Sequence, residues 1–492
     1  MNTFMNNLTN ATNYNYTTNG ALAHKSTNSM VYDLFAMGGA FRNRSESDVV
    51  LLFKNAFEEN KELALKCLFY LRDCRGGQGE RRFFRLCFKW LCDKYPEIAR
   101  RNLENVSEYG RWDDLIYSTI GTGLERAALV LVAKQLTLDM GCKTPSLLAK
   151  WMPSENASSK ETKRVANIVR SQLGMSHKEY RKTLSVLRTR INIVEKLMSQ
   201  NRWDEIEFDK IPSKAGLVYK NAFARRDLIA KKYEAFMKDT TTKVNAGTLY
   251  PYEIIRDCVK ATGWYDFALI EDTERLALEK YWNNLPDYLN GNPCKMMCVV
   301  DTSGSMIGNP MNVAISLGIY CAERLGGDFK NHFISFSSRP QLIKVEGVDI
   351  VDKAQRIYKK NLCENTNIEK TFDLLLNMAL KSNPEDVPET IVVISDMQID
   401  SMTSPRISVN NIATEMEEIR LRWVAKGLTM PKLVYWNVNA SKATILDKGP
   451  NVSFVSGCSP VIFEQVIKGV TGYQLMLDKL LSERYNAVVV EG

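Results

Sequence analysis

The sequence predicts an α-helical array followed by a doubly wound α/β domain. From about residue 29 to residue 285, apolar residues recur every three or four positions, as they do in amphipathic helices. After residue 293, short apolar runs typical of buried strands alternate with helical segments. A chain of 492 residues is long enough for about two to four domains, and a hydrophobic fraction of 45% can supply their cores.

Three segments follow from these patterns. Residues 1–28 are rich in Asn and Thr and lack apolar periodicity, so they predict a flexible or loosely docked arm. Residues 29–292 should form the helical array, and any internal repeats have diverged beyond recognition. Residues 293–492 should form one domain with a parallel sheet covered on both faces by helices.

Composition excludes several classes of protein. No apolar run approaches the ~20 residues that cross a bilayer, and the first thirty residues lack the apolar segment of a secretory signal. We therefore expect a soluble, cytoplasmic monomer with no membrane partner. The eleven cysteines are scattered and odd in number, which favours reduced thiols. Only three widely separated histidines are present, so a zinc site or a Cys–His or Ser–His catalytic pair is hard to assemble, and we predict no enzymatic activity.

Positive charge is concentrated in one stretch of the chain. Residues 151–243 contain 20 basic and 11 acidic residues, whereas the whole chain carries a net charge of +8. Such an excess indicates either a polyanionic partner, usually nucleic acid, or a solvated helical surface. Within it, residues 177–200 predict one helix with an apolar side and an opposite side without acidic residues, which favours contact with phosphates. The predicted RNA contacts on that side are Lys178, Arg181, Lys182, Arg188 and Lys196.

Further arginines surround the glycine-rich segment at residues 75–79. This segment lacks the G-K-[ST] of a phosphate-binding loop, so we interpret it as a turn between helices. Arg72, Arg75, Arg81 and Arg82 are predicted to be additional RNA contacts. Trp112, Trp151 and Trp203 either stack on bases or, as is commoner for tryptophan, anchor contacts between helices.

Polar loops in the C-terminal domain offer oxygen ligands for a metal ion. Asp301, Ser303 and Ser305 follow an apolar strand, Thr366 precedes a helix, and Asp396 follows a second strand. In open parallel sheets, ligands bind beyond the carboxyl ends of the strands. Hydroxyl and carboxylate oxygens suit Mg²⁺ or another divalent cation, which retains water and can accept an acidic group from a partner. The alternative is a hydroxyl-rich turn that binds no metal.

The motif D-T-S-G-S-M after a buried strand, with a later Thr and a strand-terminal Asp, resembles the von Willebrand factor A domain. In that family the corresponding positions form the metal-ion-dependent adhesion site. The resemblance implies that Asp301, Ser303, Ser305, Thr366 and Asp396 form this site here. Met397 departs from the pattern, because many members have glycine after the aspartate of the third loop, and this leaves the geometry of that loop open.

The helical region carries a second resemblance. The segments LRDCRGGQGERRFF, YGRWDDLI, KWMPSENASSKE, YRKTLSVLRTRINIVEKL and IPSKAGLVYKNAFARRD resemble an uncharacterised family that joins a helical domain to an A domain. That family resembles the Ro autoantigen, or TROVE, family, whose rings of HEAT-like helical repeats are closed by an A domain. Ro proteins bind small structured RNAs and the single-stranded ends of misfolded RNAs. The resemblance implies an RNA-binding helical domain, and leaves open whether the helices close into a ring.

Three functions remain as alternatives. The favoured one is an RNA-binding ribonucleoprotein scaffold whose affinity depends strongly on salt. The second is a protein-interaction module in which the metal captures a carboxylate of a protein partner and the basic helices are merely solvated. The third is a metal-dependent nuclease, which the site disfavours because two-metal chemistry requires clustered carboxylates.

Overall fold

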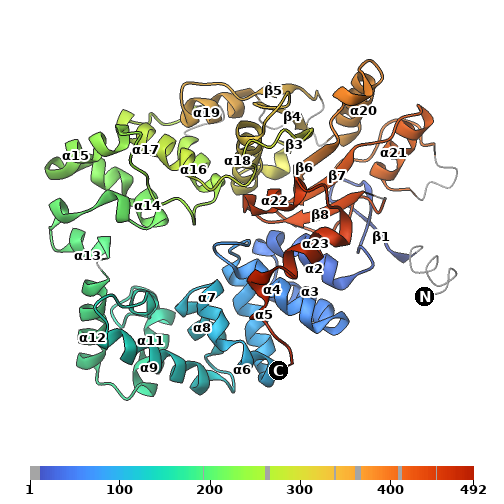
Figure 1. Ribbon diagram of the computed structural model, residues 1–492. Helices are drawn as coiled ribbons and strands as arrows, with labels where there is room; N and C mark the ends of the chain where they lie inside the picture. The colour runs from blue at the N-terminus through green and yellow to red at the C-terminus, as the bar shows by residue number, and fades with distance from the viewer. Residues whose placement is uncertain are drawn as a thin grey trace. The chain divides into compact units, whose positions relative to one another are not determined.

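The computed structural model describes residues 12–191, 193–260, 266–336, 339–360, 367–407, 413–449 and 451–491. They belong to two compact units: Met1–Ser45 with Ala246–Leu480, and Glu46–Asn245 with Leu481–Gly492. We call the first the sheet unit and the second the helical unit (Figure 1). The units differ from the predicted segments, because the chain passes between them three times and neither 28 nor 292 is a boundary.

The sheet unit is built on a six-stranded sheet with the order β5-β4-β3-β6-β7-β8. Its members are β3 (Met296–Asp301), β4 (His332–Phe336), β5 (Leu342–Lys344), β6 (Thr390–Ser395), β7 (Lys432–Asn437) and β8 (Val452–Ser456). All neighbours run parallel except β4 and β5, which pair antiparallel. The parallel arrangement is thus as predicted for β3, β4, β6 and β7, whereas β8 was not predicted and β5 is an antiparallel edge strand that follows β4 after a short connection. A short return of this kind allows only antiparallel pairing.

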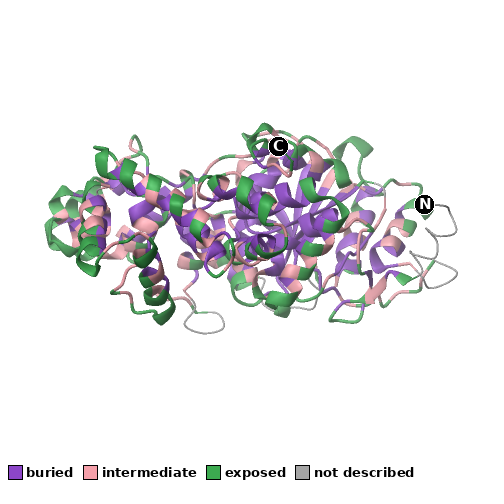
Figure 2. Cartoon of the chain, turned by 90° about the horizontal axis from the view of Figure 1, so that it is seen from below, coloured by how far each residue is buried: buried purple, intermediate pink, exposed green. Residues whose placement is uncertain are grey.

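Helices cover both faces of the sheet, and buried residues fill the interior between them (Figure 2). Strand β3 is buried at every position and β6 at every position after its first, which explains their nearly uninterrupted apolar sequences. Helix α18 packs against β3, whereas α2 and α23 pack against β8. The helices of this unit are α2 (Met30–Met37), α16 (Pro251–Cys258), α17 (Asp272–Asn283), α18 (Asn309–Arg324), α19 (Ile350–Lys360), α20 (Ile368–Ala379), α21 (Glu415–Ala425), α22 (Phe463–Val466) and α23 (Gly472–Leu480).

The described part of the predicted arm is docked on the sheet unit rather than loose. It forms a hairpin of β1 (Tyr14–Tyr16) and β2 (Leu22–His24). His24 exchanges two backbone hydrogen bonds with Ile445, at 2.8 and 3.0 Å. The Thr17 hydroxyl donates to the carbonyl oxygen of Ile399 at 2.7 Å. Backbone hydrogen bonds do not require apolar periodicity, so the sequence pattern does not reveal this docking.

The helical unit confirms the predicted array, since helices adjacent in sequence pack on one another. Its helices are α3 (Glu46–Glu59), α4 (Lys61–Arg72), α5 (Arg81–Lys94), α6 (Pro96–Arg101), α7 (Leu103–Tyr109), α8 (Trp112–Thr119), α9 (Glu125–Gly141), α10 (Leu148–Trp151), α11 (Lys160–Gln172), α12 (His177–Arg190), α13 (Val194–Ser199), α14 (Ser213–Arg225) and α15 (Asp227–Lys238). The segment 177–200, predicted as one helix, is divided into α12 and α13.

The last residues of the chain belong to the helical unit. The Arg484 guanidinium donates two hydrogen bonds to Asp73, and the Tyr485 ring stacks on Tyr109 at a centroid distance of 5.6 Å.

Two further predictions, on the cysteines and on membrane-spanning helices, have structural outcomes. Every cysteine among the described residues is a free thiol, as expected. Within the same residues, the helices are all too short or too polar to cross a membrane.

Candidate functional site

The first candidate site lies at the carboxyl ends of β3 and β6. These strands are neighbours at the centre of the sheet, and from them the connections lead to opposite edges. Ligands of doubly wound sheets bind at this reversal, because the flanking loops diverge there. Asp301 ends β3, Ser395 ends β6, and Asp396 follows directly.

Hydrogen bonds fix the conformation of the loop after β3, which contains Ser303 and Ser305. Asp301 accepts one bond from the Ser303 backbone N–H at 2.9 Å and another from the Ser395 hydroxyl at 2.5 Å. The hydroxyl oxygens of Ser303 and Ser305 are 3.2 Å apart. Asp301, Ser303 and Asp396 are at most 2% exposed, whereas Ser305 is exposed. Four of the five predicted metal ligands are thus gathered in one place, and Thr366 lies outside the described residues.

The two carboxylates form a buried, uncompensated anionic pair. Burial, and next the neighbouring charge of Asp396, raise the pKa of Asp301 to about 7. Burial likewise raises the pKa of Asp396, although a hydrogen bond from Ser305 opposes it. No described Lys, Arg or His lies within ion-pairing distance of either carboxylate. Two acids and two hydroxyls that lack a counter-charge fit a divalent cation, which would supply that charge.

The loop after β6 accommodates Met397 at the position where the resemblance predicts glycine. Met397 is 2% exposed and has a φ of +63°, a left-handed conformation in which glycine carries no strain. Its backbone N–H donates to the Ser395 hydroxyl at 2.9 Å, and that hydroxyl donates to Asp301. The loop therefore keeps its conformation with a non-glycine residue. The sequence places Ser395 with Asp396 in a strand-terminal loop of oxygen donors, but only Asp396 was predicted to be a metal ligand.

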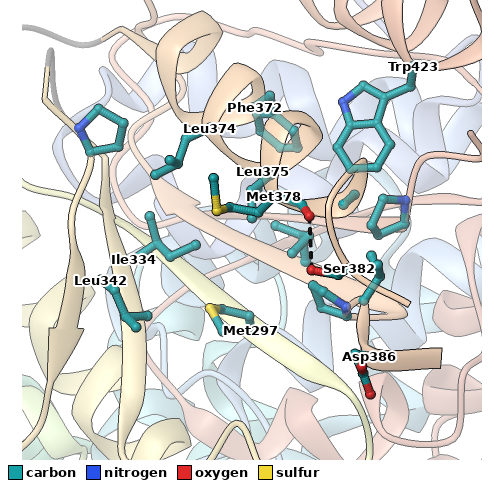
Figure 3. A pocket seen from close by; sticks show the side chains of 16 residues that line it. Met297, Ile334, Leu342, Phe372, Leu374, Leu375, Met378, Ser382, Asp386 and Trp423 are labelled. Carbon is teal, nitrogen blue, oxygen red and sulfur yellow. Dashed lines mark hydrogen bonds between the residues drawn. The ribbon is translucent and has the colours of Figure 1, made fainter. Parts of the chain in front are cut away.

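An apolar cavity lies near the opposite, amino ends of the same strands. It has a volume of about 470 Å³ and lies beside Met297 and Ile391, the second residues of β3 and β6. Figure 3 shows Phe372, Leu375 and Met378 of α20 facing this cavity. The cavity is thus separated from Asp301 by the length of β3, and it contributes nothing to the candidate metal site.

The second candidate site is the basic surface of α12 and α13. Lys178, Arg181 and Lys182 are exposed on α12, and Lys196 is half-buried on α13. Arg188 is different, because its guanidinium donates to the carbonyl oxygens of Ala149 and Met152 and to the Ser154 hydroxyl, at 2.8–3.0 Å. Its donors thus hold the loop after α10 in place, and contact of Arg188 with RNA stays a prediction.

Three of these cations line one cavity of about 320 Å³. Arg181 and Arg188 of α12 and Lys196 of α13 surround it, together with residues of the loop that precedes α11. Lys196 of α13 thus lies beside the same cavity as the two arginines of α12. The remaining lining residues are Ser154, Glu155, Asn156, Tyr180, Leu184 and Ser185.

The arginines around residues 75–79 have two different roles. Arg72 is 3% exposed and binds Asp114 with its Nε at 2.7 Å, which leaves its guanidinium little access to RNA. Arg75, Arg81 and Arg82 are exposed and remain predictions. Arg75 also donates to the Glu108 carbonyl oxygen at 3.0 Å.

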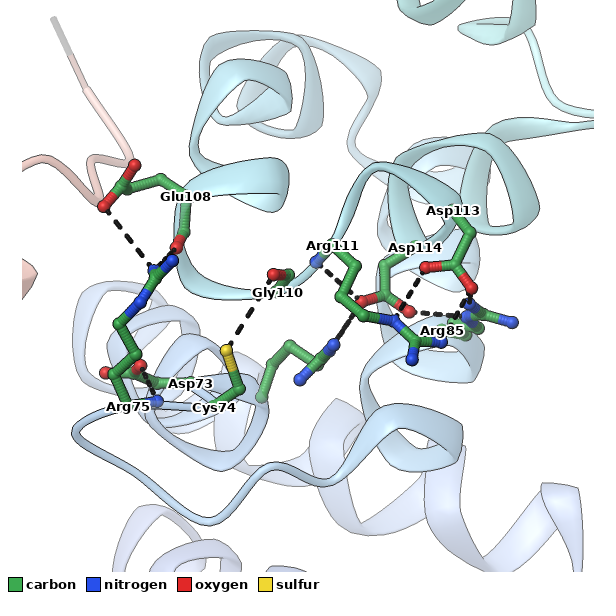
Figure 4. Close-up of polar contacts among 10 residues, drawn as sticks. Asp73, Cys74, Arg75, Arg85, Glu108, Gly110, Arg111, Asp113 and Asp114 are labelled. Atoms are coloured by element: carbon green, nitrogen blue, oxygen red, sulfur yellow. Dashed lines mark hydrogen bonds and ion pairs between the residues drawn. The ribbon is translucent and has the colours of Figure 1, made fainter. Parts of the chain in front are cut away.

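The segment YGRWDD forms an ion-pair network with α5. Arg85 binds both Asp113 and Asp114, at 2.8 and 2.7 Å, and Arg111 binds Asp113 at 2.7 Å (Figure 4). The 75–79 segment packs closely beside it. A Cβ atom on Gly77 would lie 2.0 Å from the Tyr70 carbonyl oxygen, so only glycine fits there. These motifs are thus accounted for by folding.

The three tryptophans considered for base stacking are half-buried. The Arg111 guanidinium lies 3.9 Å from the centre of the Trp151 ring, and that of Arg226 lies 5.2 Å from the centre of the Trp203 ring. Trp112 lines a separate cavity with Leu115 and Leu131. At Trp151 and Trp203 a cation already covers one face, which favours the interpretation that they anchor contacts within the protein.

Two family models match this chain, and both describe domains of unknown function. The Domain of unknown function (DUF2828) matches residues 17–117 and 145–292, and the Domain of unknown function (DUF7788) matches residues 295–474. The two matches meet near residue 293, where the sequence pattern changes from helices to alternating strands and helices.

Two individual proteins are similar to this chain. The uncharacterized protein L728 of Acanthamoeba polyphaga mimivirus is 29% identical over 478 residues, which cover 88% of this chain and 80% of that protein. The crystal structure of the Deinococcus radiodurans RO (RSR) protein aligns with 93% of this chain and 100% of its own, at 13% identity and a TM-score of 0.47. Because the first family model matches more than half of the residues, the chain belongs to the DUF2828 family of unknown function.

Proposed function

We propose that this protein is an RNA-binding scaffold whose helical unit contacts phosphates through Lys178, Arg181, Lys182 and Lys196. We call these four residues the α12–α13 cations. The observation that carries the proposal is their lack of counter-charges: no described carboxylate lies within ion-pairing distance of any of them. Other exposed cations of the same stretch are paired, such as Arg164 with Glu161 and Lys238 with Glu234, both at 2.6 Å.

Unpaired cations on one surface favour a polyanion over plain solvation. A solvated helical surface usually mixes the two signs, because each pair lowers the repulsion among like charges. RNA rather than duplex DNA is proposed because the uncharacterised family that this region resembles in sequence is in turn similar to Ro proteins in its architecture. Phosphate contacts would supply most of the affinity, so binding would depend on salt. The proposed activity is binding and not catalysis.

We also propose a divalent cation, Mg²⁺ in the simplest case, at Asp301, Ser303, Ser305 and Asp396, with Thr366 as a further ligand. It would supply the positive charge that the buried carboxylates lack. The exposure of Ser305 beside these buried groups supports a second candidate function, capture of an acidic group of a protein partner. In that case the cation would be the contact point, and Asp301→Asn would abolish the capture.

A pair of triple variants tests RNA binding. Replacing Lys178, Arg181 and Lys182 by alanine removes three unpaired cations, whereas replacing Arg164, Arg202 and Lys238 removes three paired ones. The first variant should lower the slope of log affinity against log salt by about 2, since each contact with single-stranded RNA contributes about 0.7. The second should leave the slope almost unchanged. The measurement is fluorescence anisotropy of a labelled single-stranded RNA with the full-length protein at several salt concentrations.

One outcome of this experiment would contradict the proposed RNA contact by α12. Both triple variants lose the same net charge, so a nonspecific effect of total charge would lower the two slopes equally. Equal slopes would exclude the role given to α12, and the absence of any binding by the unmodified protein would exclude RNA as the partner.

A further inference from the structure

The cavity near the amino ends of β3 and β6 has an apolar wall that a ligand can reach. Leu342 of β5 is 61% exposed and Met378 of α20 is 47% exposed, and both line the cavity. Leu374, Leu375 and Val387 also line it and are half-buried. Covering these side chains with an apolar ligand removes their surface from water, which favours binding. The volume of about 470 Å³ falls within the ~300–1,000 Å³ that is common for small-molecule sites.

The polar groups of this cavity lie together on one side of it. Figure 3 shows Ser382 and Asp386 on the side opposite Ile334 and Leu342. Ser382 and Asp386 are exposed, and Asp386 is the one charged residue among the described residues that line the cavity. Its carboxylate accepts a hydrogen bond from the Asn383 side-chain amide at 3.1 Å. No described Lys, Arg or His lies within ion-pairing distance of this carboxylate, so it can pair with a cation of a ligand.

The end of α20 is a second feature that favours a cation. Met378 and Ala379 of its last turn line the cavity, and so does Ser382, which follows the helix. The carboxyl end of a helix carries a partial negative charge. The last turn of α20 contains no basic residue that would offset this charge. Lys381 follows the helix, but it does not line the cavity.

We propose that this cavity binds a small lipophilic amine. The apolar chain of the ligand would lie against Leu342, Leu375 and Met378, and its ammonium group would lie beside Asp386. A fatty acid would place a second negative charge beside Asp386 and the end of α20, and a fatty alcohol would leave Asp386 without a counter-charge. The inference goes beyond RNA binding and does not depend on it, because the cavity belongs to the sheet unit and the α12–α13 cations belong to the helical unit.

Three ligands with the same alkyl chain and different head groups test the proposal. Decylamine, decanol and decanoate are titrated at pH 7, below their micelle-forming concentrations, into the full-length protein by isothermal titration calorimetry. Decylamine should bind about two- to fivefold more tightly than decanol, since an exposed ion pair contributes modestly, and decanoate should bind most weakly. From octylamine to nonylamine to decylamine, the affinity should rise about fourfold per methylene group.

Two neighbouring carboxylates provide matched variants. Asp386→Asn removes the charge that faces the cavity, whereas Glu385→Gln removes an exposed charge that does not line it. The first variant should bind decylamine and decanol equally, and the second should keep the preference for decylamine. Met378→Trp places a larger side chain in the cavity, so it should weaken the binding of decylamine by about tenfold or more.

Several results would overturn the inference. Decylamine that does not bind, or that binds no more tightly than decanol or decanoate, would exclude a site for amines. Binding that Met378→Trp leaves intact would place the amine elsewhere on the protein. Light scattering tests whether a second copy of the chain covers the cavity, and a dimer that Met378→Trp dissociates would also overturn the inference. Thermal unfolding of each variant verifies its folding. Each of these results leaves the proposed RNA binding untouched.

Discussion

Replacing Arg72 by methionine is expected to lower the free energy of unfolding by about 3 kcal/mol. Arg72 is 3% exposed, and its partner Asp114 is fully buried. Removing one member of a buried ion pair leaves the other charge without compensation, which costs about 3–5 kcal/mol. Asp114 retains the hydrogen bonds from Arg85 and from the Arg111 backbone, so the lower end of that range applies. Chemical denaturation followed by circular dichroism measures the change.

Arg75→Met is the matched control for this prediction. It removes an arginine three positions away in the same motif, but the Arg75 side chain is 57% exposed. Its loss should change the free energy of unfolding by no more than about 0.5 kcal/mol. Equal stability of the two variants would show that the Arg72–Asp114 pair does not support the fold, and it would return Arg72 to the candidates for RNA contact.

Without divalent cations, Asp301→Asn is expected to stabilise the protein at pH 8 and to have little effect near pH 4. The pKa of Asp301 is about 7 in the folded protein, chiefly through burial, against about 3.9 in an unfolded chain. Between these values the folded state retains a proton that the unfolded state has lost. Raising the pH therefore removes stability, and the loss is complete above about pH 7. The difference amounts to at most about 4 kcal/mol.

Mg²⁺ should restore the stability that the unmodified protein loses at high pH, and it should not change the stability of Asp301→Asn. A cation that binds only the folded state raises the unfolding midpoint as its concentration rises. At pH 8, Mg²⁺ should therefore raise the thermal midpoint of the unmodified protein and leave that of Asp301→Asn unchanged. The measurement is differential scanning fluorimetry with and without Mg²⁺ at pH 4 and pH 8. If Mg²⁺ and Ca²⁺ have no effect on the unmodified protein at pH 8, the loops form only a hydroxyl-rich turn.

The sequence was most informative where a short motif follows a strand. Asp301 and Asp396 could be placed together because the ends of neighbouring parallel strands meet at one edge of a sheet. Apolar runs identified β3, β6 and β7 because these strands are buried on both faces. The antiparallel edge strand β5 was missed, since its three residues include two exposed positions and carry little pattern.

The sequence was least informative where a residue's role depends on distant parts of the chain. Arg72 and Arg75 are equally basic in the sequence, but only Arg72 meets a buried carboxylate 42 positions away. Arg188 lies among exposed cations and is held by carbonyl groups of another loop. The place of residues 481–491 in the helical unit could not be read from the sequence either, because Arg484 and Asp73 are brought together by tertiary packing and not by local periodicity.

The most direct test of the central claim is to map where RNA contacts the protein. The purified full-length protein is crosslinked by ultraviolet light to a single-stranded RNA, and the crosslinked peptides are identified by mass spectrometry. Crosslinks should be concentrated in residues 154–200, which include the loop before α11, α12 and α13. They should decrease when Lys178, Arg181 and Lys182 are replaced by alanine. Crosslinks confined to the sheet unit, or distributed equally over both units, would contradict the account.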